Sequence, residues 1–148
     1  MAKQAAVIFD MDGTLADCGH RLHYVEGVAK KNWERFFEGS KDDKPRPEIV
    51  RLAIELAQNN AIIIASGRPE SLRRITELWL QKFAVPFEGI YLRKNNDRRS
   101  DGVVKAEMLA VMQEDGFEPW LAVDDRDTAV SAWRELGICC LQCDESKY

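Results

Sequence analysis

Residues 5–14 read AAVIFDMDGT, an apolar run that ends in two acids, a glycine and a threonine. A run of consecutive apolar residues suits a strand buried on both faces, as in the interior of a parallel sheet. The pattern recurs at residues 61–66, which read AIIIAS, and at residues 120–125, which read WLAVDD. Weaker copies occupy residues 89–92 and 138–141. We therefore expect a sheet of five buried strands.

Helical periodicity fills the intervals between these strands. Apolar residues recur at three- and four-residue spacing within residues 49–56, 72–79, 104–112 and 129–136. Alternating strands and helices joined by right-handed crossovers place helices on both faces of a parallel sheet. We predict an α/β fold, and specifically a three-layer Rossmann-like parallel sheet with helices on both faces.

The length of 148 residues fits a single domain, residues 1–148, because two independently cored domains would be unusually small. An insertion at about residues 18–45 has room for one helix, expected at residues 24–37, and a loop. It is too short to form a cap domain. Three aromatic residues have the spacing that anchors such a helix to a core, with stacking on nucleic-acid bases as the alternative. They are Trp33, Phe36 and Phe37.

Charged residues make up 31% of the chain, and the net charge is −4. This balance excludes a generally basic nucleic-acid coat protein, but the positive surplus within residues 93–105 could still bind a polyanion. The apolar runs are too short to span a bilayer, and the N-terminal residues lack the pattern of a signal peptide. We expect a cytoplasmic protein without a membrane partner, whose four cysteines are reduced.

Six chemically distinctive residues follow the expected strands or open an expected helix. They are Asp10, Asp12, Ser66, Lys105, Asp124 and Asp125. Because the carboxyl ends of parallel strands meet at one edge of a sheet, we expect these side chains to converge there. Four carboxylates in one place repel one another and raise at least one pKa. A hard divalent cation removes this repulsion, and oxygen ligands with room for water favour Mg²⁺.

The remaining groups of this set suit the chemistry of a phosphoryl group. Ser66 and Lys105 are hydrogen-bond donors that can hold phosphoryl oxygens beside the metal. One aspartate can attack phosphorus, since carboxylates form aspartyl-phosphate intermediates. A second aspartate, two residues later, can protonate the leaving oxygen and then deprotonate a water molecule.

The constellation resembles the haloacid dehalogenase-like phosphohydrolase superfamily. Its first motif matches DMDGT at residues 10–14, its second matches Ser66, its third matches Lys105 and its fourth matches residues 124–125. The resemblance covers nearly the whole chain. It implies a central sheet with strand order 5-4-1-2-3.

The resemblance also implies a role for each residue. Asp10 would be the nucleophile and Asp12 the general acid and base. Mg²⁺ would be held by Asp10, the main-chain carbonyl of Asp12, and Asp124, with Asp125 supporting metal-bound water or Lys105. Ser66 and Lys105 would hold the phosphate.

A narrower resemblance links the chain to the 3′-phosphatase domain of phage-type polynucleotide kinase-phosphatases. It rests on DGTLA at residues 12–16 with a downstream arginine, SGR at residues 66–68, the spacing of residues 97–105, and DDR at residues 124–126. The substrate-binding candidates that it supplies are Arg21, Gly67, Arg68, Arg99, Asp101 and Arg126. The chain contains no GxxxxGK[ST] phosphate loop, so we expect no 5′-kinase activity from it.

These features favour a Mg²⁺-dependent phosphomonoesterase that acts through an aspartyl-phosphate, with nucleotide or polynucleotide 3′-phosphate ends as substrate. The first alternative is a phosphatase of the same superfamily that acts on a mononucleotide or another small ester. The second is a receiver module that accepts a phosphoryl group on aspartate. In a receiver the acceptor follows a middle strand, whereas here DMDGT follows the first strand, which favours an enzyme. We expect a phosphorylated nucleic-acid end as partner and see no sign of an obligate protein partner.

Overall fold

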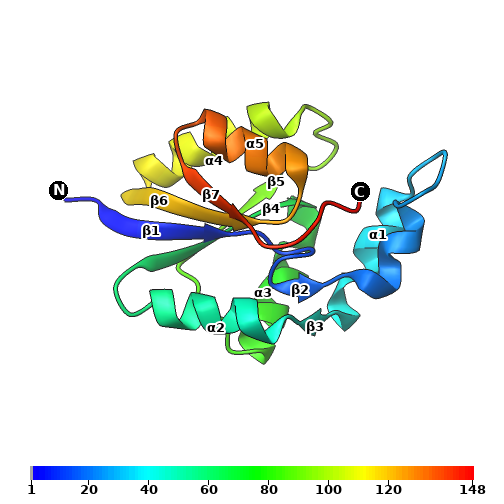
Figure 1. Ribbon diagram of the computed structural model, residues 1–148, viewed down its shortest axis with the longest axis horizontal. Coiled ribbons are helices and arrows are strands. Elements are labelled where there is room, and N and C mark those ends of the chain that lie inside the picture. Colours follow the sequence, from blue (N-terminus) through cyan, green and yellow to red (C-terminus); the bar gives the residue numbers. More distant parts are fainter. Residues whose placement is uncertain (1) are drawn as a thin grey trace.

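The computed structural model describes residues 2–148 and has a five-stranded parallel sheet at its centre (Figure 1). The strands are β1 (Gln4–Phe9), β4 (Ala61–Pro69), β5 (Gly89–Arg93), β6 (Phe117–Asp124) and β7 (Cys139–Gln142). Their spatial order is β5-β4-β1-β6-β7, and each neighbouring pair is parallel. Numbered one to five along the chain, this is the expected order 5-4-1-2-3 read from the other edge.

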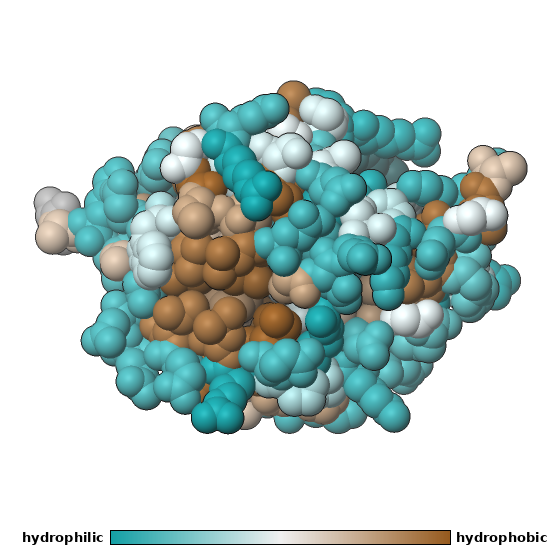
Figure 2. All heavy atoms as spheres, in the orientation of Figure 1, coloured by the Kyte–Doolittle hydropathy of each residue, from teal (hydrophilic) through white to brown (hydrophobic). Residues whose placement is uncertain are grey.

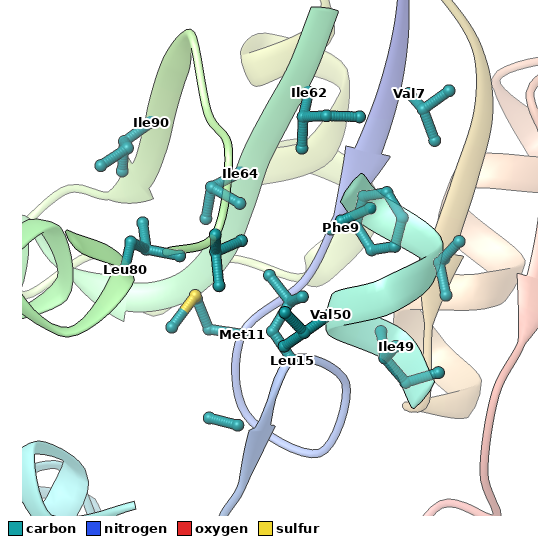
Figure 3. Close-up of a cluster of buried hydrophobic side chains, with 14 of the residues drawn as sticks. Val7, Phe9, Met11, Leu15, Ile49, Val50, Ile62, Ile64, Leu80 and Ile90 are labelled. Atoms are coloured by element: carbon teal, nitrogen blue, oxygen red, sulfur yellow. The ribbon is translucent and has the colours of Figure 1, made fainter. Parts of the chain in front are cut away.

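Alternate residues of the central strands enter two different hydrophobic clusters, because successive side chains of a strand point to opposite faces. Val7 pairs with Ile62 and Phe9 with Ile64 in the ladder between β1 and β4. These four side chains belong to one cluster, which Figure 3 shows together with Ile49, Val50 and Leu80 from the covering helices. The sheet is thus buried on both faces, which explains why its strands read as continuous apolar runs.

Two pairs of helices cover the sheet. α2 (Pro47–Leu56) and α3 (Arg73–Lys82) lie on one face, and α4 (Asp101–Glu114) and α5 (Asp127–Glu135) lie on the other (Figure 1). Trp133 of α5 is fully buried against the second face, as its place in the helical periodicity predicts. The three-layer α/β architecture is therefore confirmed.

The insertion between β1 and α2 is built from short elements. They are β2 (Ala16–Asp17), the 3₁₀ helix η1 (Gly19–Tyr24), α1 (Trp33–Glu38), the 3₁₀ helix η2 (Gly39–Asp42) and β3 (Lys44–Pro45). The expected helix over residues 24–37 is wrong, because α1 begins only at Trp33. Gly27 has a positive φ of +66°, which no helical residue adopts, so a helix cannot continue through this position. The side chain of Asn32 caps the start of α1 by accepting a hydrogen bond from Arg35 N at 3.1 Å.

The aromatic residues of α1 anchor the insertion as expected. Phe36 is buried in a small cluster with Cys18 and Val25, separate from the two clusters of the sheet. Trp33 and Phe37 are half-buried beside it. In Figure 1, α1 lies beyond the carboxyl ends of the strands, so the insertion stands next to the edge of the sheet where the distinctive residues were expected.

The surface carries hydrophobic side chains away from that edge. Figure 2 shows them gathered between α2 and the sheet, on the side of the molecule opposite to α1. Among residues 2–148, no helix combines the length and the apolar character that crossing a membrane requires.

Candidate active site

Three carboxylates meet where β1 and β6 end. Asp10 directly follows β1, Asp124 is the last residue of β6, and Asp125 follows it. All three side chains are buried, and each offers an oxygen atom within 4.8 Å of the other two. Oδ1 of Asp124 accepts hydrogen bonds from the backbone N–H groups of Asp125, at 2.9 Å, and Arg126, at 3.3 Å. Oδ2 of Asp124 is buried and has no hydrogen-bond partner within residues 2–148.

The proximity of these carboxylates changes their protonation. Burial and the neighbouring Asp124 raise the pKa of Asp10 well above its ordinary value. Burial also raises the pKa of Asp124, and burial together with Asp124 raises the pKa of Asp125 to about 7. Three buried carboxylates cannot all ionise without a compensating cation. The oxygen-only ligand set and the unpartnered Oδ2 of Asp124 fit a hard cation such as Mg²⁺.

The carboxylate of Asp12 lies outside this cluster. It is bonded to two buried arginines: Nη2 of Arg68 donates to Asp12 Oδ1 at 2.7 Å, and Nη2 of Arg21 donates to the same oxygen. Burial alone would raise the pKa of Asp12, but the attraction of Arg68 and Arg21 outweighs it and lowers this pKa to about 2. The charge of Asp12 still raises the pKa values of Asp10 and Asp125, as the expected repulsion requires, but Asp12 itself is held ionised by the two guanidinium groups.

Asp43, which sequence reasoning missed, completes the network behind Asp12. Its carboxylate accepts from Arg21 Nε at 2.9 Å and lies 3.6 Å from Arg68 Nη2. Its backbone carbonyl accepts from Trp79 Nε1 at 2.9 Å. Two arginines and two aspartates thus balance their charges in a site where all four side chains are almost fully buried. No pattern in the sequence indicated Asp43, because the need for a second anion follows only from the burial of Arg21 and Arg68.

Ser66 and Lys105 lie on the rim of the acidic cluster, as expected. Ser66 lies in β4 and its Oγ accepts a hydrogen bond from Arg68 N at 3.1 Å. Lys105 lies on α4, 3% exposed, with its Nζ 5.2 Å from the ring centroid of Trp133, and its positive charge opposes the upward shift of the pKa of Asp10. Both residues line a cleft of about 900 Å³ together with Asp10 and Asp12.

The loop after β1 is held by residues that are distant in the sequence. Nη1 of Arg46 donates to the carbonyl of Gly13 at 2.7 Å, and the hydroxyl of Tyr148 donates to the carbonyl of Asp12 at 3.1 Å. The hydroxyl of Thr14 donates to Oδ1 of Asp125 at 3.4 Å. Neither Arg46 nor Tyr148 belongs to a motif, so no pattern in the sequence identified them. They fix the carbonyl groups of the loop that carries Asp10 and Asp12 to the cleft.

The expected substrate-binding residues fall into two groups. Gly67, Arg99, Asp101 and Arg126 line the cleft, whereas Arg21 and Arg68 lie behind Asp12 and are at most 1% exposed. The guanidinium of Arg99 is already paired with Asp97 at 2.8 Å and with Glu107 at 2.7 Å. Asp101 accepts from Arg93 Nη2 at 2.8 Å and lies 3.7 Å from Arg126 Nη1.

Comparisons with known proteins agree with this geometry. The family model of the polynucleotide kinase PNKP phosphatase domain matches residues 4–148. A chain of the Pnkp1/Rnl/Hen1 complex is 26% identical, with a TM-score of 0.81, and the match covers 99% of this chain and 47% of that chain. A chain of the Pnkp1/Rnl/Hen1 RNA repair complex is 25% identical, with a TM-score of 0.80 and coverages of 99% and 44%.

This chain therefore spans less than half the length of those two relatives. A haloacid dehalogenase-like family hydrolase from Streptococcus pneumoniae shares the fold, with 17% identity, a TM-score of 0.67, and coverage of 95% of this chain and 84% of that chain.

Proposed function

The chain belongs to the family of polynucleotide kinase PNKP phosphatase domains, which have the haloacid dehalogenase-like fold, and from this membership we propose a specific activity. The protein is a Mg²⁺-dependent phosphomonoesterase that removes 3′-phosphate groups from polynucleotide ends through an aspartyl-phosphate. It acts as one phosphatase domain over residues 1–148, with an insertion at about residues 18–45.

The observation that carries this proposal is the cluster of Asp10, Asp124 and Asp125 with the unpartnered oxygen of Asp124. Asp10, Asp124 and the main-chain carbonyl of Asp12 would hold the cation, with Asp125 beside them. Bound Mg²⁺ supplies the positive charge that allows these carboxylates to ionise together and that draws electron density from phosphoryl oxygens.

The chain's own residues then carry the two steps. An oxygen of Asp10 attacks phosphorus, the bond from phosphorus to the sugar 3′-oxygen breaks, and Asp12 gives its proton to that oxygen. Asp12 next takes a proton from water, whose oxygen attacks phosphorus, so that inorganic phosphate leaves and Asp10 is regenerated. Ser66 and Lys105 donate hydrogen bonds to the phosphoryl oxygens in both steps.

The environment of Asp12 favours its role as a base, and the charge of a bound substrate bears on its role as an acid. Arg21 and Arg68 keep its carboxylate ionised in the free protein, which is the form required of a base. A phosphoryl group entering beside Asp12 brings negative charge, and a nearby like charge raises the pKa of a carboxyl group. Substrate binding itself therefore favours the proton uptake that the acid step requires.

The small insertion supports a polymer end as substrate. Between β1 and α2 the chain forms only one α-helix, of six residues, and short 3₁₀ and strand elements. This insertion borders the cleft through Trp33 and Phe37 but is too small to act as a separate cap domain. A nucleic-acid strand can thus enter the cleft by its end.

Phosphate release from a substrate panel tests the proposal. The panel holds 3′- and 5′-phosphorylated hexanucleotides, 3′- and 5′-mononucleotides, and p-nitrophenyl phosphate, each with Mg²⁺ and with EDTA. We expect repeated turnover with Mg²⁺, fastest on the 3′-phosphorylated hexanucleotide, and none from Asp10→Asn. Preference for a small ester would favour the small-molecule alternative, and a single phosphorylation without turnover would favour the receiver alternative.

A further inference from the structure

The segment that follows β7, residues 143–148, runs past the edge of the sheet where β1 and β6 end and reaches the insertion (Figure 1). At its start, the backbone N–H of Cys143 donates to the carbonyl of Asp124 at 3.0 Å. At its other end, the hydroxyl of Tyr148 donates to the carbonyl of Asp12 at 3.1 Å. The segment thus ties together the two stretches of chain that carry the carboxylates of the candidate site.

The ring of Tyr148 packs against the insertion. Its centroid lies 5.6 Å from that of Phe36 and 6.1 Å from that of Trp33, within the small hydrophobic cluster that anchors α1. The guanidinium carbon of Arg126 lies 5.3 Å from the centroid of the same ring. Because these contacts hold the ring, the hydroxyl keeps its place beside the Asp12 carbonyl. One side chain therefore joins the loop after β1 to α1.

The carbonyl of Asp12 is one of the groups that would hold Mg²⁺ in the proposed function. Among residues 2–148, the hydroxyl of Tyr148 is the one hydrogen-bond donor to this carbonyl, whereas the next carbonyl of the loop, that of Gly13, accepts from Arg46. A carbonyl oxygen has two lone pairs, so a bond from Tyr148 leaves one for a cation. Hydrogen bonds from outside a metal site fix the direction of its ligands before the metal binds.

We propose that Tyr148 is a positioning residue of the metal site, which fixes the Asp12 carbonyl for the cation and links this carbonyl to the insertion. The proposal rests on the cation that the proposed function requires, and it adds a residue that lies outside every motif. Tyr148 acts through Asp12 and not on the reacting atoms. Since coupling between two sites is reciprocal, cation binding at the carbonyl also stabilises the insertion through the same side chain.

Metal affinity can be measured without turnover, from thermal unfolding of the metal-free protein at increasing MgCl₂ concentrations. Tyr148→Phe keeps the ring and removes the hydroxyl, and it should raise the dissociation constant for Mg²⁺ by about tenfold to a hundredfold. Tyr91→Phe is the matched control, because the Tyr91 hydroxyl donates to Asp115 at 2.6 Å and does not line the cleft. It should bind Mg²⁺ like the unchanged protein. Equal Mg²⁺ affinities of the two variants would overturn the proposal.

Amide hydrogen exchange tests the link to the insertion. At a saturating MgCl₂ concentration, exchange at residues 33–38 should slow in the unchanged protein and in Tyr91→Phe, because the bound cation stabilises α1 through Tyr148. Tyr148→Phe should lose most of this response. Equal slowing of exchange in all three proteins would overturn the link between the carbonyl and α1.

Hydrolysis of p-nitrophenyl phosphate separates metal positioning from a direct contact with substrate. The rate deficit of Tyr148→Phe should be largest at low Mg²⁺ concentration and should shrink as Mg²⁺ rises. A deficit that is the same at every Mg²⁺ concentration would assign the hydroxyl to the substrate and overturn the proposal.

The unchanged protein distinguishes a failure of this proposal from a failure of the proposed function. If its melting temperature rises with MgCl₂ and that of Tyr148→Phe rises identically, the cation site stands and the role of Tyr148 is wrong. If its melting temperature does not respond to MgCl₂ and no phosphate ester is hydrolysed, the proposed function is wrong, and the role of Tyr148 in it is wrong as well.

Discussion

The φ angle of Gly13 is +82°, and a Cβ atom on this residue would lie 2.1 Å from Oδ2 of Asp125. Any side chain here would combine a strained backbone with a collision against a carboxylate of the acidic cluster. We expect Gly13→Ala to destabilise the fold by about 1–3 kcal/mol and to abolish the stabilisation that Mg²⁺ provides. Urea unfolding with and without Mg²⁺ measures both effects.

Gly102→Ala is the matched control for Gly13→Ala. Gly102 lies in the first turn of α4, its φ is not positive, and its nearest neighbour to an added Cβ is Ser100 Oγ at 3.9 Å. Alanine should be neutral here or stabilise the helix by up to about 1 kcal/mol. Equal effects of the two substitutions would contradict the role assigned to Gly13.

Asp43 supplies the second negative charge that two buried arginines require. Asp43→Asn leaves Arg21 and Arg68 with Asp12 as their only carboxylate partner, and removing one member of a buried ion network costs about 3–5 kcal/mol. The neighbouring Asp42 is exposed and forms no ion pair within residues 2–148, so Asp42→Asn should change stability by less than about 0.5 kcal/mol. Chemical denaturation of both variants decides this, and an Asp43→Asn variant as stable as Asp42→Asn would refute it.

The candidate site could be predicted from the sequence only where residues follow strands or, as with Lys105, lie near the start of a helix. Asp10, Ser66 and Asp124 were identified because the carboxyl ends of parallel strands share an edge. The direction of the Asp12 side chain could not be predicted, since it depends on Arg21 and Arg68 folding back onto it. Asp43, Arg46 and Tyr148 act through tertiary contacts of irregular segments, which leave no periodic pattern.

Elements with a long apolar pattern were predicted and short ones were not. The five strands of the sheet and the four helices that cover it carry enough buried residues to fix their type, whereas the spatial order of the strands came from the family resemblance. The insertion consists of elements of two to six residues, whose stability comes from tertiary packing and capping rather than from propensity. The aromatic spacing of residues 33–37 correctly indicated a helix, but its start depends on Asn32 and Gly27.

The cap of α1 offers a test at this scale. Asn32→Ala removes the acceptor for Arg35 N and should cost about 1 kcal/mol, whereas Asn32→Ser keeps a capping oxygen and should cost only a few tenths. Because α1 has only six residues, removal of one capping bond should also increase amide hydrogen exchange at residues 33–38. Exchange measured by mass spectrometry checks this, and equal exchange in the alanine and serine variants would argue against a capping role.

At the scale of the whole molecule, the acidic cluster makes stability depend on pH and on metal. Without Mg²⁺, the pKa values of Asp10, Asp124 and Asp125 are raised in the folded state, that of Asp125 to about 7. The folded protein then binds more protons than the unfolded chain, so its stability rises as pH falls from about 7 toward 4. The pKa of Asp12 is lowered to about 2 in the folded state, so ionised Asp12 adds to folding stability above pH 4. This stabilisation is lost as pH falls from about 4 toward 2. Metal-free protein should therefore be most stable near pH 4–5.

Mg²⁺ should reverse this preference, because it binds the ionised cluster and competes with protons for the same oxygens. At a concentration one hundred times its dissociation constant it should add about 2.7 kcal/mol at neutral pH and much less at pH 5. Urea unfolding from pH 4 to 8, in EDTA and in MgCl₂, measures stability against pH without and with the metal.

Asp124→Asn should stabilise the metal-free protein at pH 7, since it removes one repelling charge, and its stability should no longer respond to Mg²⁺. A metal-free protein that loses stability steadily from pH 7 to pH 5, with no added stability from Mg²⁺ at any pH, would rule out a cation-binding cluster.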